Sequence, residues 1–213
     1  MKKVVSIALA LIMLVCLFAG CSSEKDASGG EALKIGFIGP LTGGAAVYGN
    51  AAKRGAEIAV KEINAKGGLQ IEFNAQDDEN DAEKSVNAYN NLMDWGMQVM
   101  VGPTTTGASI AVSAQANADR TFMLTPSASS VDVIDGKDNV FQVCFTDPNQ
   151  GVASADYISA NMAGAKVAVI YRNADAYSQG IRDTFVSEAA DKGLESCMRA
   201  PSPLTPPPTS PCS

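Results

Sequence analysis

Two hydroxyl-rich segments are the features of this sequence best suited to binding a ligand. The first, GPTTTGAS from Gly102 to Ser109, follows an apolar run and precedes a segment with helical periodicity. The second, TPSASS from Thr125 to Ser130, follows the next apolar run. A turn that opens a helix points free backbone N–H groups outward, and such groups suit a singly charged anion such as a carboxylate. The alternative is a turn whose hydroxyl groups only cap the helix.

The first segment has the glycine spacing of a phosphate-binding loop but lacks that loop's lysine. Ala108 stands where an ammonium group would reach the phosphates, so a nucleotide finds little charge support. The carboxyl ends of parallel strands meet at one edge of a sheet, where open α/β sheets bind ligands. We therefore expect the hydroxyl side chains of these two turns to converge on one small polar group, namely those of Thr105, Thr106, Ser127 and Ser129.

The 213-residue chain contains no histidine, which excludes serine or cysteine catalysis with a histidine base and zinc sites that use histidine. The acidic run DDEND at 77–81 lacks the glycine and terminal glutamate of a calcium loop, so a solvated strand-to-helix turn explains it. We expect no catalysis, no metal and no cofactor. The net charge of −7, with no cluster of Lys and Arg after position 3, argues against a nucleic-acid partner.

The first residues have the pattern of an export signal. Lys2 and Lys3 precede an apolar run from Val4 to Phe18, which is shorter than the roughly 20 residues of a membrane-spanning helix. The run closes in LFAGC, which resembles the lipobox of bacterial lipoproteins, with Phe18 at the position where leucine is usual. This resemblance implies that Cys21 is lipidated and becomes the first mature residue. The alternative is ordinary signal cleavage with Cys21 as an unmodified thiol.

From Leu33 onward, apolar runs alternate with amphipathic segments, which predicts an α/β fold with a parallel sheet and crossover helices. Strands are expected at 33–39, 69–75, 98–102, 121–125, 139–145 and 166–172, and helices at 47–66, 81–94, 108–119, 150–162 and 178–192.

The pattern divides the chain into five parts: a signal peptide at 1–20, a flexible tether at 21–32, an N-terminal ligand-binding lobe at 33–146, the start of a second lobe at 147–195 and an aberrant proline-rich tail at 196–213. Six prolines between Pro201 and Pro211 cannot continue a sheet. We expect the second lobe to be incomplete; a proline-rich linker to a further partner is the alternative.

Five segments together resemble the leucine/isoleucine/valine-binding protein family, the receptors of branched-chain amino-acid ABC transporters: IGFIGPLTGGAAVYG, GAEIAVKEINAKGG, VGPTTTGAS, LTPSASS and YRNADAYSQG. The resemblance runs from about Lys34 to Glu195. It implies a periplasmic-binding-protein type I fold, with a parallel sheet flanked by helices in lobe one and, in this chain, an incomplete second α/β lobe. In that family two lobes close on an amino acid.

The resemblance also implies roles for single residues. Thr106 corresponds to the hydroxyl and backbone donor for the ligand carboxylate, and Ser129 to its partner. Ser127 would offer its backbone carbonyl to the ligand ammonium group. Tyr48 and Tyr177 match aromatic positions that close over the ligand, with ordinary packing as the alternative for each.

The resemblance stops before the family's acidic partner for the ammonium group, which would lie beyond Glu195. We therefore expect this chain to bind its solute weakly or not at all. The function expected is that of a lipid-anchored receptor on the extracytoplasmic face of a bacterial membrane, which presents a branched-chain or other amino acid to an ABC permease. The alternative is a ligand-sensing receptor domain of the same fold.

Overall fold

A five-stranded parallel sheet organises the first part of the computed structural model, which describes residues 31–199. The predicted signal peptide, Cys21 and most of the predicted tether lie outside the described residues, as does the proline-rich segment from residue 200 onward. Within 31–199, no helix is both long and apolar enough to cross a membrane.

The strand order of the first sheet is β2-β1-β3-β4-β5, with every neighbouring pair parallel. The strands are β1 (Leu33–Gly39), β2 (Ile71–Asp77), β3 (Val99–Val101), β4 (Phe122–Thr125) and β5 (Val140–Gln142). From β1 the chain first runs to β2 at one edge and then to β3, β4 and β5 on the other side, so the strand order reverses between β1 and β3. Open α/β sheets bind ligands at such a reversal.

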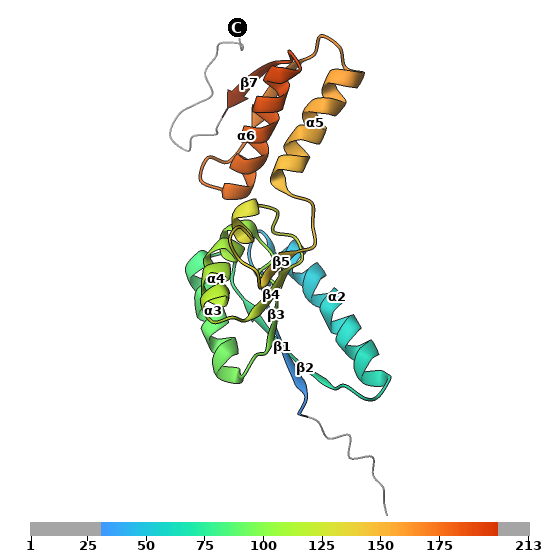
Figure 1. The fold of residues 1–213 in the computed structure, drawn as a ribbon, viewed down its shortest axis with the longest axis vertical. Helices are drawn as coiled ribbons and strands as arrows, with labels where there is room; N and C mark the ends of the chain where they lie inside the picture. Colours follow the sequence, from blue (N-terminus) through green and yellow to red (C-terminus); the bar gives the residue numbers. More distant parts are fainter. Residues whose placement is uncertain (1–30, 200–213) are drawn as a thin grey trace, which may run out of the picture.

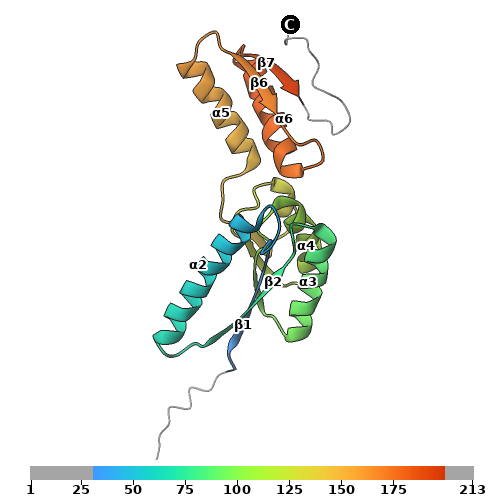
Figure 2. The same ribbon diagram turned by 180° about the vertical axis from the view of Figure 1, so that it is seen from behind.

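Helices cover both faces of this sheet, as Figures 1 and 2 show. Helix α2 (Ala46–Ala65) packs on β1 and β2, and on the opposite face α3 (Ala82–Trp95) packs against α4 (Thr106–Ala118). A short 3-10 helix, η1 (Val131–Val133), follows the turn after β4. The main core lies under α3 and α4, and its largest fully buried members include Tyr89, Leu92, Met100 and Met123.

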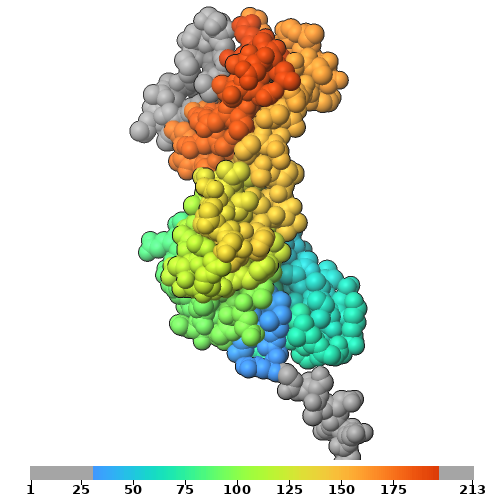
Figure 3. Space-filling model, in the orientation of Figure 1, coloured from blue at the N-terminus to red at the C-terminus, as the bar shows by residue number. Residues whose placement is uncertain are grey.

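The second lobe contains a two-stranded parallel sheet, β6 (Lys166–Ile170) and β7 (Glu195–Arg199), with α5 (Asp147–Asn161) packed against α6 (Ala176–Asp191). A smaller core joins the helices to the sheet through Ala155, Phe185 and Ala189. Strand β7 runs to Arg199, four residues past the expected lobe boundary at 195. The space-filling view shows a narrow region between the two lobes (Figure 3).

The predicted fold class is confirmed, but several element boundaries differ from the prediction, and two of them affect the connection between the lobes. Strand β5 ends at Gln142 instead of continuing to residue 145, because Val143 (68% exposed) and Phe145 (65% exposed) lie in the connection to the second lobe. Helix α5 begins at Asp147 rather than at 150, with Pro148 in its first turn, where the missing N–H of proline costs nothing.

Helix α2 provides a matched pair of glycines that tests this packing. A Cβ atom at Gly49 would lie 2.0 Å from the Pro40 carbonyl oxygen, whereas one at Gly55 would meet nothing within 4 Å. We expect Gly49→Ala to lower the free energy of unfolding by about 1–3 kcal/mol through overpacking. Gly55→Ala should raise it by roughly 0.5–1 kcal/mol, because alanine favours the helix. Urea unfolding followed by circular dichroism measures both; equal effects would contradict the described α2 contact.

Candidate functional site

The two hydroxyl-rich turns lie side by side at the carboxyl edge of the first sheet. Strands β3 and β4 are parallel neighbours, with Val101 opposite Leu124, so the turns that follow them leave the sheet together. The Ser127 hydroxyl donates to the Thr104 carbonyl oxygen at 2.6 Å and the Thr125 hydroxyl to the Pro103 carbonyl oxygen at 2.6 Å. These two bonds fix the β4 turn against the β3 turn.

The β3 turn delivers the start of α4 without a side-chain cap. Thr105 occupies the N-cap position with extended backbone, but its side chain makes no capping hydrogen bond. The hydroxyl oxygens of Thr104 and Thr105 are buried and have no partner among the described residues. The hydroxyl groups of Thr104 and Thr105 therefore do not cap α4. The first backbone N–H groups of the helix remain available to an anion.

Ser129 is held by a residue that sequence reasoning did not single out. Its hydroxyl donates to Asp147 Oδ1 at 2.6 Å, and the Asp147 backbone N–H donates to the Ser129 carbonyl oxygen at 2.9 Å. Both residues are buried, at 3% and 1% exposure. This joint ties the β4 turn of the first lobe to the first residue of α5 in the second lobe. The sequence shows only that Asp147 is an acid near the start of a predicted helix. Acids are common at helix starts because they stabilise the helix, so this position did not indicate a contact with Ser129.

The Asp147 carboxylate lies in an environment that disfavours its charge. Burial raises the pKa of Asp147, and the negative charges of Asp175 and Asp132 raise it further, while the hydrogen bond from Ser129 opposes the shift. Oδ2 of Asp147 is buried and has no hydrogen-bond partner among the described residues.

The two predicted aromatic residues start helices of different lobes. Tyr48 lies in the first turn of α2 and is 65% exposed; Tyr177 lies in the first turn of α6 and is 42% exposed. Burial raises the pKa of Tyr177, and the neighbouring Asp147, Tyr48 and Asp175 raise it further. The exposure of the two rings leaves both free to contact a ligand.

Thr106 and Ser129, in the two turns, are shielded from solvent in this arrangement. Thr106 is 4% exposed, and α4 contacts α6 of the second lobe. At Gly180 of α6 an added Cβ would lie 2.9 Å from Asp147 Oδ2, so α6 packs directly on this carboxylate. Helix α6 therefore lies against the start of the first lobe's α4 as well as against α5.

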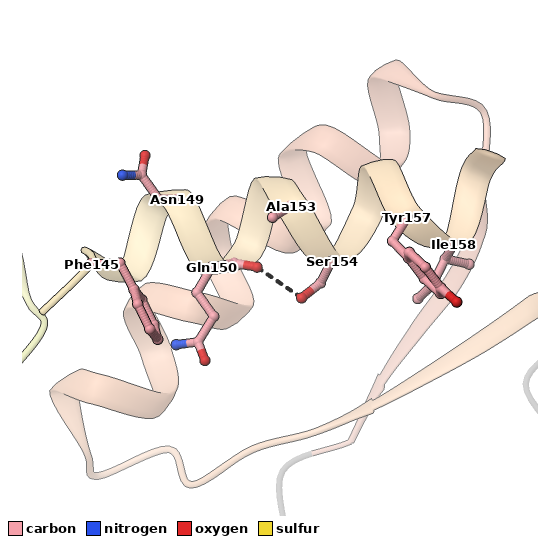
Figure 4. A pocket seen from close by; sticks show the side chains of 7 residues that line it. All are labelled: Phe145, Asn149, Gln150, Ala153, Ser154, Tyr157 and Ile158. Carbon is pink, nitrogen blue, oxygen red and sulfur yellow. Dashed lines mark hydrogen bonds between the residues drawn. The ribbon is translucent and has the colours of Figure 1, made fainter. Parts of the chain in front are cut away.

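Two open hollows lie elsewhere, and neither is lined by Thr106 or Ser129. One lies along α5, where Figure 4 shows Phe145, Gln150 and Tyr157 among its lining side chains. The other lies beside β6 and includes Tyr177. Within residues 31–199, no three His, Cys, Asp or Glu side chains are grouped as a metal ion would require.

Comparison with known proteins identifies the family. A family model described as periplasmic binding protein matches residues 32–211. The chain belongs to this periplasmic binding protein family. It is a family of solute-binding proteins rather than enzymes. The family membership and the fold inferred from the sequence are thereby confirmed.

Three relatives illustrate the similarity. The chain is 38% identical to Leu/Ile/Val-binding protein homolog 3 of Brucella melitensis, over 76% of this chain and 44% of the relative. It is 36% identical to a Leu/Ile/Val-binding protein of Rhizobium johnstonii, over 72% of this chain and 42% of the relative. The branched-chain amino acid transporter substrate-binding protein LivJ of Streptococcus pneumoniae, solved in complex with isoleucine, superimposes with a TM-score of 0.74 at 32% identity, covering 80% of this chain and 49% of LivJ. The chain thus spans about half the length of the relatives it matches.

The pKa of Asp147 should report the contact with Ser129. Because the Ser129 hydroxyl donates to the ionised carboxylate and lowers its pKa, Ser129→Ala should raise the Asp147 pKa further. Ser127→Ala is the matched control, since the Ser127 hydroxyl donates to a carbonyl oxygen and not to a carboxylate. Carboxyl ¹³C chemical shifts of Asp147 followed against pH measure both; a larger shift in the control would contradict the joint.

Proposed function

We propose that this chain is the solute-binding component of an ABC importer and binds a branched-chain or other amino acid between its two lobes. The observation that carries the proposal is the uncapped start of α4, held beside the β4 turn by the bond from Ser127 to the Thr104 carbonyl. Such a start offers unpaired backbone N–H groups and buried hydroxyls to a carboxylate, the group that all amino acids share.

In this proposal Thr106 and Ser129 bind the ligand carboxylate, and the Thr105 hydroxyl lies beside them. Because the Ser129 hydroxyl donates its one hydrogen to Asp147, Ser129 contributes its backbone N–H. The Ser127 carbonyl faces the ammonium group, and Tyr48 and Tyr177 cover the ligand from the two lobes. Because α6 packs over these turns in the described arrangement, the solute enters with the lobes apart and is enclosed when they approach.

The relatives support a branched-chain amino acid as the solute. Two of them are Leu/Ile/Val-binding proteins by name, and the LivJ complex contains isoleucine. The described part of the second lobe has only the two strands β6 and β7, and Ile170 of β6 is 76% exposed. We therefore expect a wet site and weak affinity, on the order of 1 mM, which corresponds to about −4 kcal/mol.

Family membership implies a location outside the cytoplasm. We propose further that the chain is held on the extracytoplasmic face of the membrane by a lipid on Cys21, where it presents its solute to permease subunits. Support comes from the sequence LFAGC and from the polar residues that follow it, which have the composition of a flexible tether.

Thr106→Val tests the ligand-binding role of the first turn. Valine keeps the shape and the backbone N–H of threonine but loses the hydroxyl, so isoleucine affinity should fall by roughly tenfold, as expected for a lost hydrogen bond to a charged group. Ser113→Ala is the control, because Ser113 is buried on the same helix and its hydroxyl donates to the Ile110 carbonyl. Titration of the ¹⁵N-labelled chain with isoleucine, followed by NMR, measures both. Equal affinities in Thr106→Val and the wild type would contradict the role.

Cys21→Ser tests the anchor. Without the thiol no acyl chain can be attached, so the exported protein should move from the detergent phase to the aqueous phase in a detergent partition experiment. Cys16→Ser, a change five residues earlier, within the apolar run that precedes Cys21, should leave the partition unchanged. Detergent-phase recovery of Cys21→Ser equal to that of wild type would mean that the anchor lies elsewhere.

A further inference from the structure

Strand β6 has an unpaired edge. It pairs with β7 on one side, and no other strand within residues 31–199 lies beside it. In the first sheet, by contrast, β1 is flanked by both β2 and β3. The free edge of β6 therefore presents backbone N–H and C=O groups with which another strand can pair.

A hollow runs along this edge. It is lined by five consecutive residues, 167–171, by Ser154 and Ile158 of α5, and by the side of α6 that carries Phe185. Ser154 and Ile158 also line the hollow along α5 that Figure 4 shows, so the two hollows adjoin. The edge is thus open to a partner rather than covered by a loop or helix of the described chain.

Strand β6 lacks the features by which proteins protect an edge from pairing. Its sequence, KVAVI, contains no proline, and its valine and isoleucine residues favour strands. Its one charged residue, Lys166, stands at the end of the strand and forms an ion pair with Glu195 of β7 at 3.0 Å. The strand also pairs with β7 residue for residue, without a bulge. The free edge is therefore regular and uncharged along most of its length.

The strand is complementary to a second copy of itself. Val167 and Val169 pack on the core of the lobe, whereas Ala168 and Ile170 are exposed. An antiparallel pair centred on Ala168 matches every residue of β6 and keeps each pair on one face, with Val167 opposite Val169 and Ala168 opposite Ala168 of the second copy. No like charges face each other in this register, because Lys166 lies opposite Ile170.

The same symmetry brings the apolar surface of α5 together. Two copies with antiparallel edge strands are related by a two-fold axis perpendicular to the sheet, so helices on one face of the sheet stay on that face. Ala155 of α5 belongs to the core against which Val167 and Val169 pack, which places α5 of one copy beside α5 of the other. Phe145 and Tyr157, each 65% exposed, line the hollow that this contact covers.

We infer that this edge is an interface between two copies of the chain, in which β6 pairs with β6 of the second copy, antiparallel and centred on Ala168. The product is a four-stranded sheet in the order β7-β6-β6-β7. A two-stranded sheet is marginal on its own, whereas four strands with a hydrophobic face make a stable layer. Because the paired strands run in opposite directions, the two first lobes lie at opposite ends of the dimer. The interface is separate from the turns that bear Thr106 and Ser129, so it does not depend on the solute.

Charges placed at the centre of the pair test both the partner and the register. Ala168 is exposed and lies outside the core, so Ala168→Lys and Ala168→Glu should leave the fold intact. In either variant alone, two like charges meet on the two-fold axis, whereas in a mixture of the two variants opposite charges meet. Ala59→Lys is the control, because Ala59 is exposed on α2 of the first lobe and receives the same charge.

Sedimentation equilibrium of the full chain in a density-matched detergent measures the association, and circular dichroism checks the fold of each variant. Wild type and Ala59→Lys should dimerise with the same dissociation constant, on the order of 10–100 μM for so small an interface. Each Ala168 variant alone should dimerise about fivefold more weakly, because of the like-charged cross-strand pair. The equimolar mixture should recover the wild-type affinity or exceed it.

A wild-type chain that stays monomeric at millimolar concentration would overturn the inference and leave the edge to a strand of another protein. Ala168 variants that dimerise as tightly as the wild type would also overturn it, since the association would then use another surface. So would variants that stay apart when mixed, because that result excludes the antiparallel register centred on Ala168. If Ala168→Lys fails to fold, Ala168→Glu tests the same repulsion on its own.

Discussion

The two-bond joint between Ser129 and Asp147 is the contact on which the relation between the lobes depends. It fixes both a backbone and a side chain of the β4 turn to the first residue of α5, and it is buried on both sides. Hydrogen bonds to charged groups contribute roughly 1.5–3 kcal/mol, and their removal leaves the charge uncompensated. The position of the second lobe is therefore coupled to the turn that we assign to the ligand.

This joint is possible because of where parallel strands end. Strands β3, β4 and β5 run in the same direction, so the turns after β3 and β4 and the connection after β5 leave one edge of the sheet. The connection after β5 crosses to the second lobe at that edge and delivers Asp147 beside Ser129, 18 residues away in sequence. The Pro103 carbonyl accepts from both Ser109 and Thr125, which makes the β3 turn rigid.

The sequence predicts helices and strands well where burial of one face sets the spacing of apolar residues. It predicts poorly where a single contact determines the end of an element or the partner of a side chain. The run from Leu33 to Gly39 is buried toward its end and forms the predicted strand. Val143 and Phe145 continue the alternation after β5 but are exposed, since a repeating pattern does not reveal where a strand leaves its neighbour. The hydroxyl groups near the edge were predictable as a group. The acceptor of each hydroxyl group was not predictable from the sequence. Ser127 donates to the Thr104 carbonyl and Ser129 to the Asp147 carboxylate, although both serines lie in the same turn.

Asp147 links the lobes through Ser129 and not through α6. Gly180 covers Oδ2, but α5 and α6 belong to the same lobe, so a movement between the lobes leaves that contact in place. The contacts that such a movement would change are the two bonds between Ser129 and Asp147 and the contact of α4 with α6. A ligand shifts a conformational equilibrium only by its difference in affinity for the two states. A solute that contacts both the β4 turn and the first turn of α6 has such a difference, because it makes both contacts only when the lobes are together.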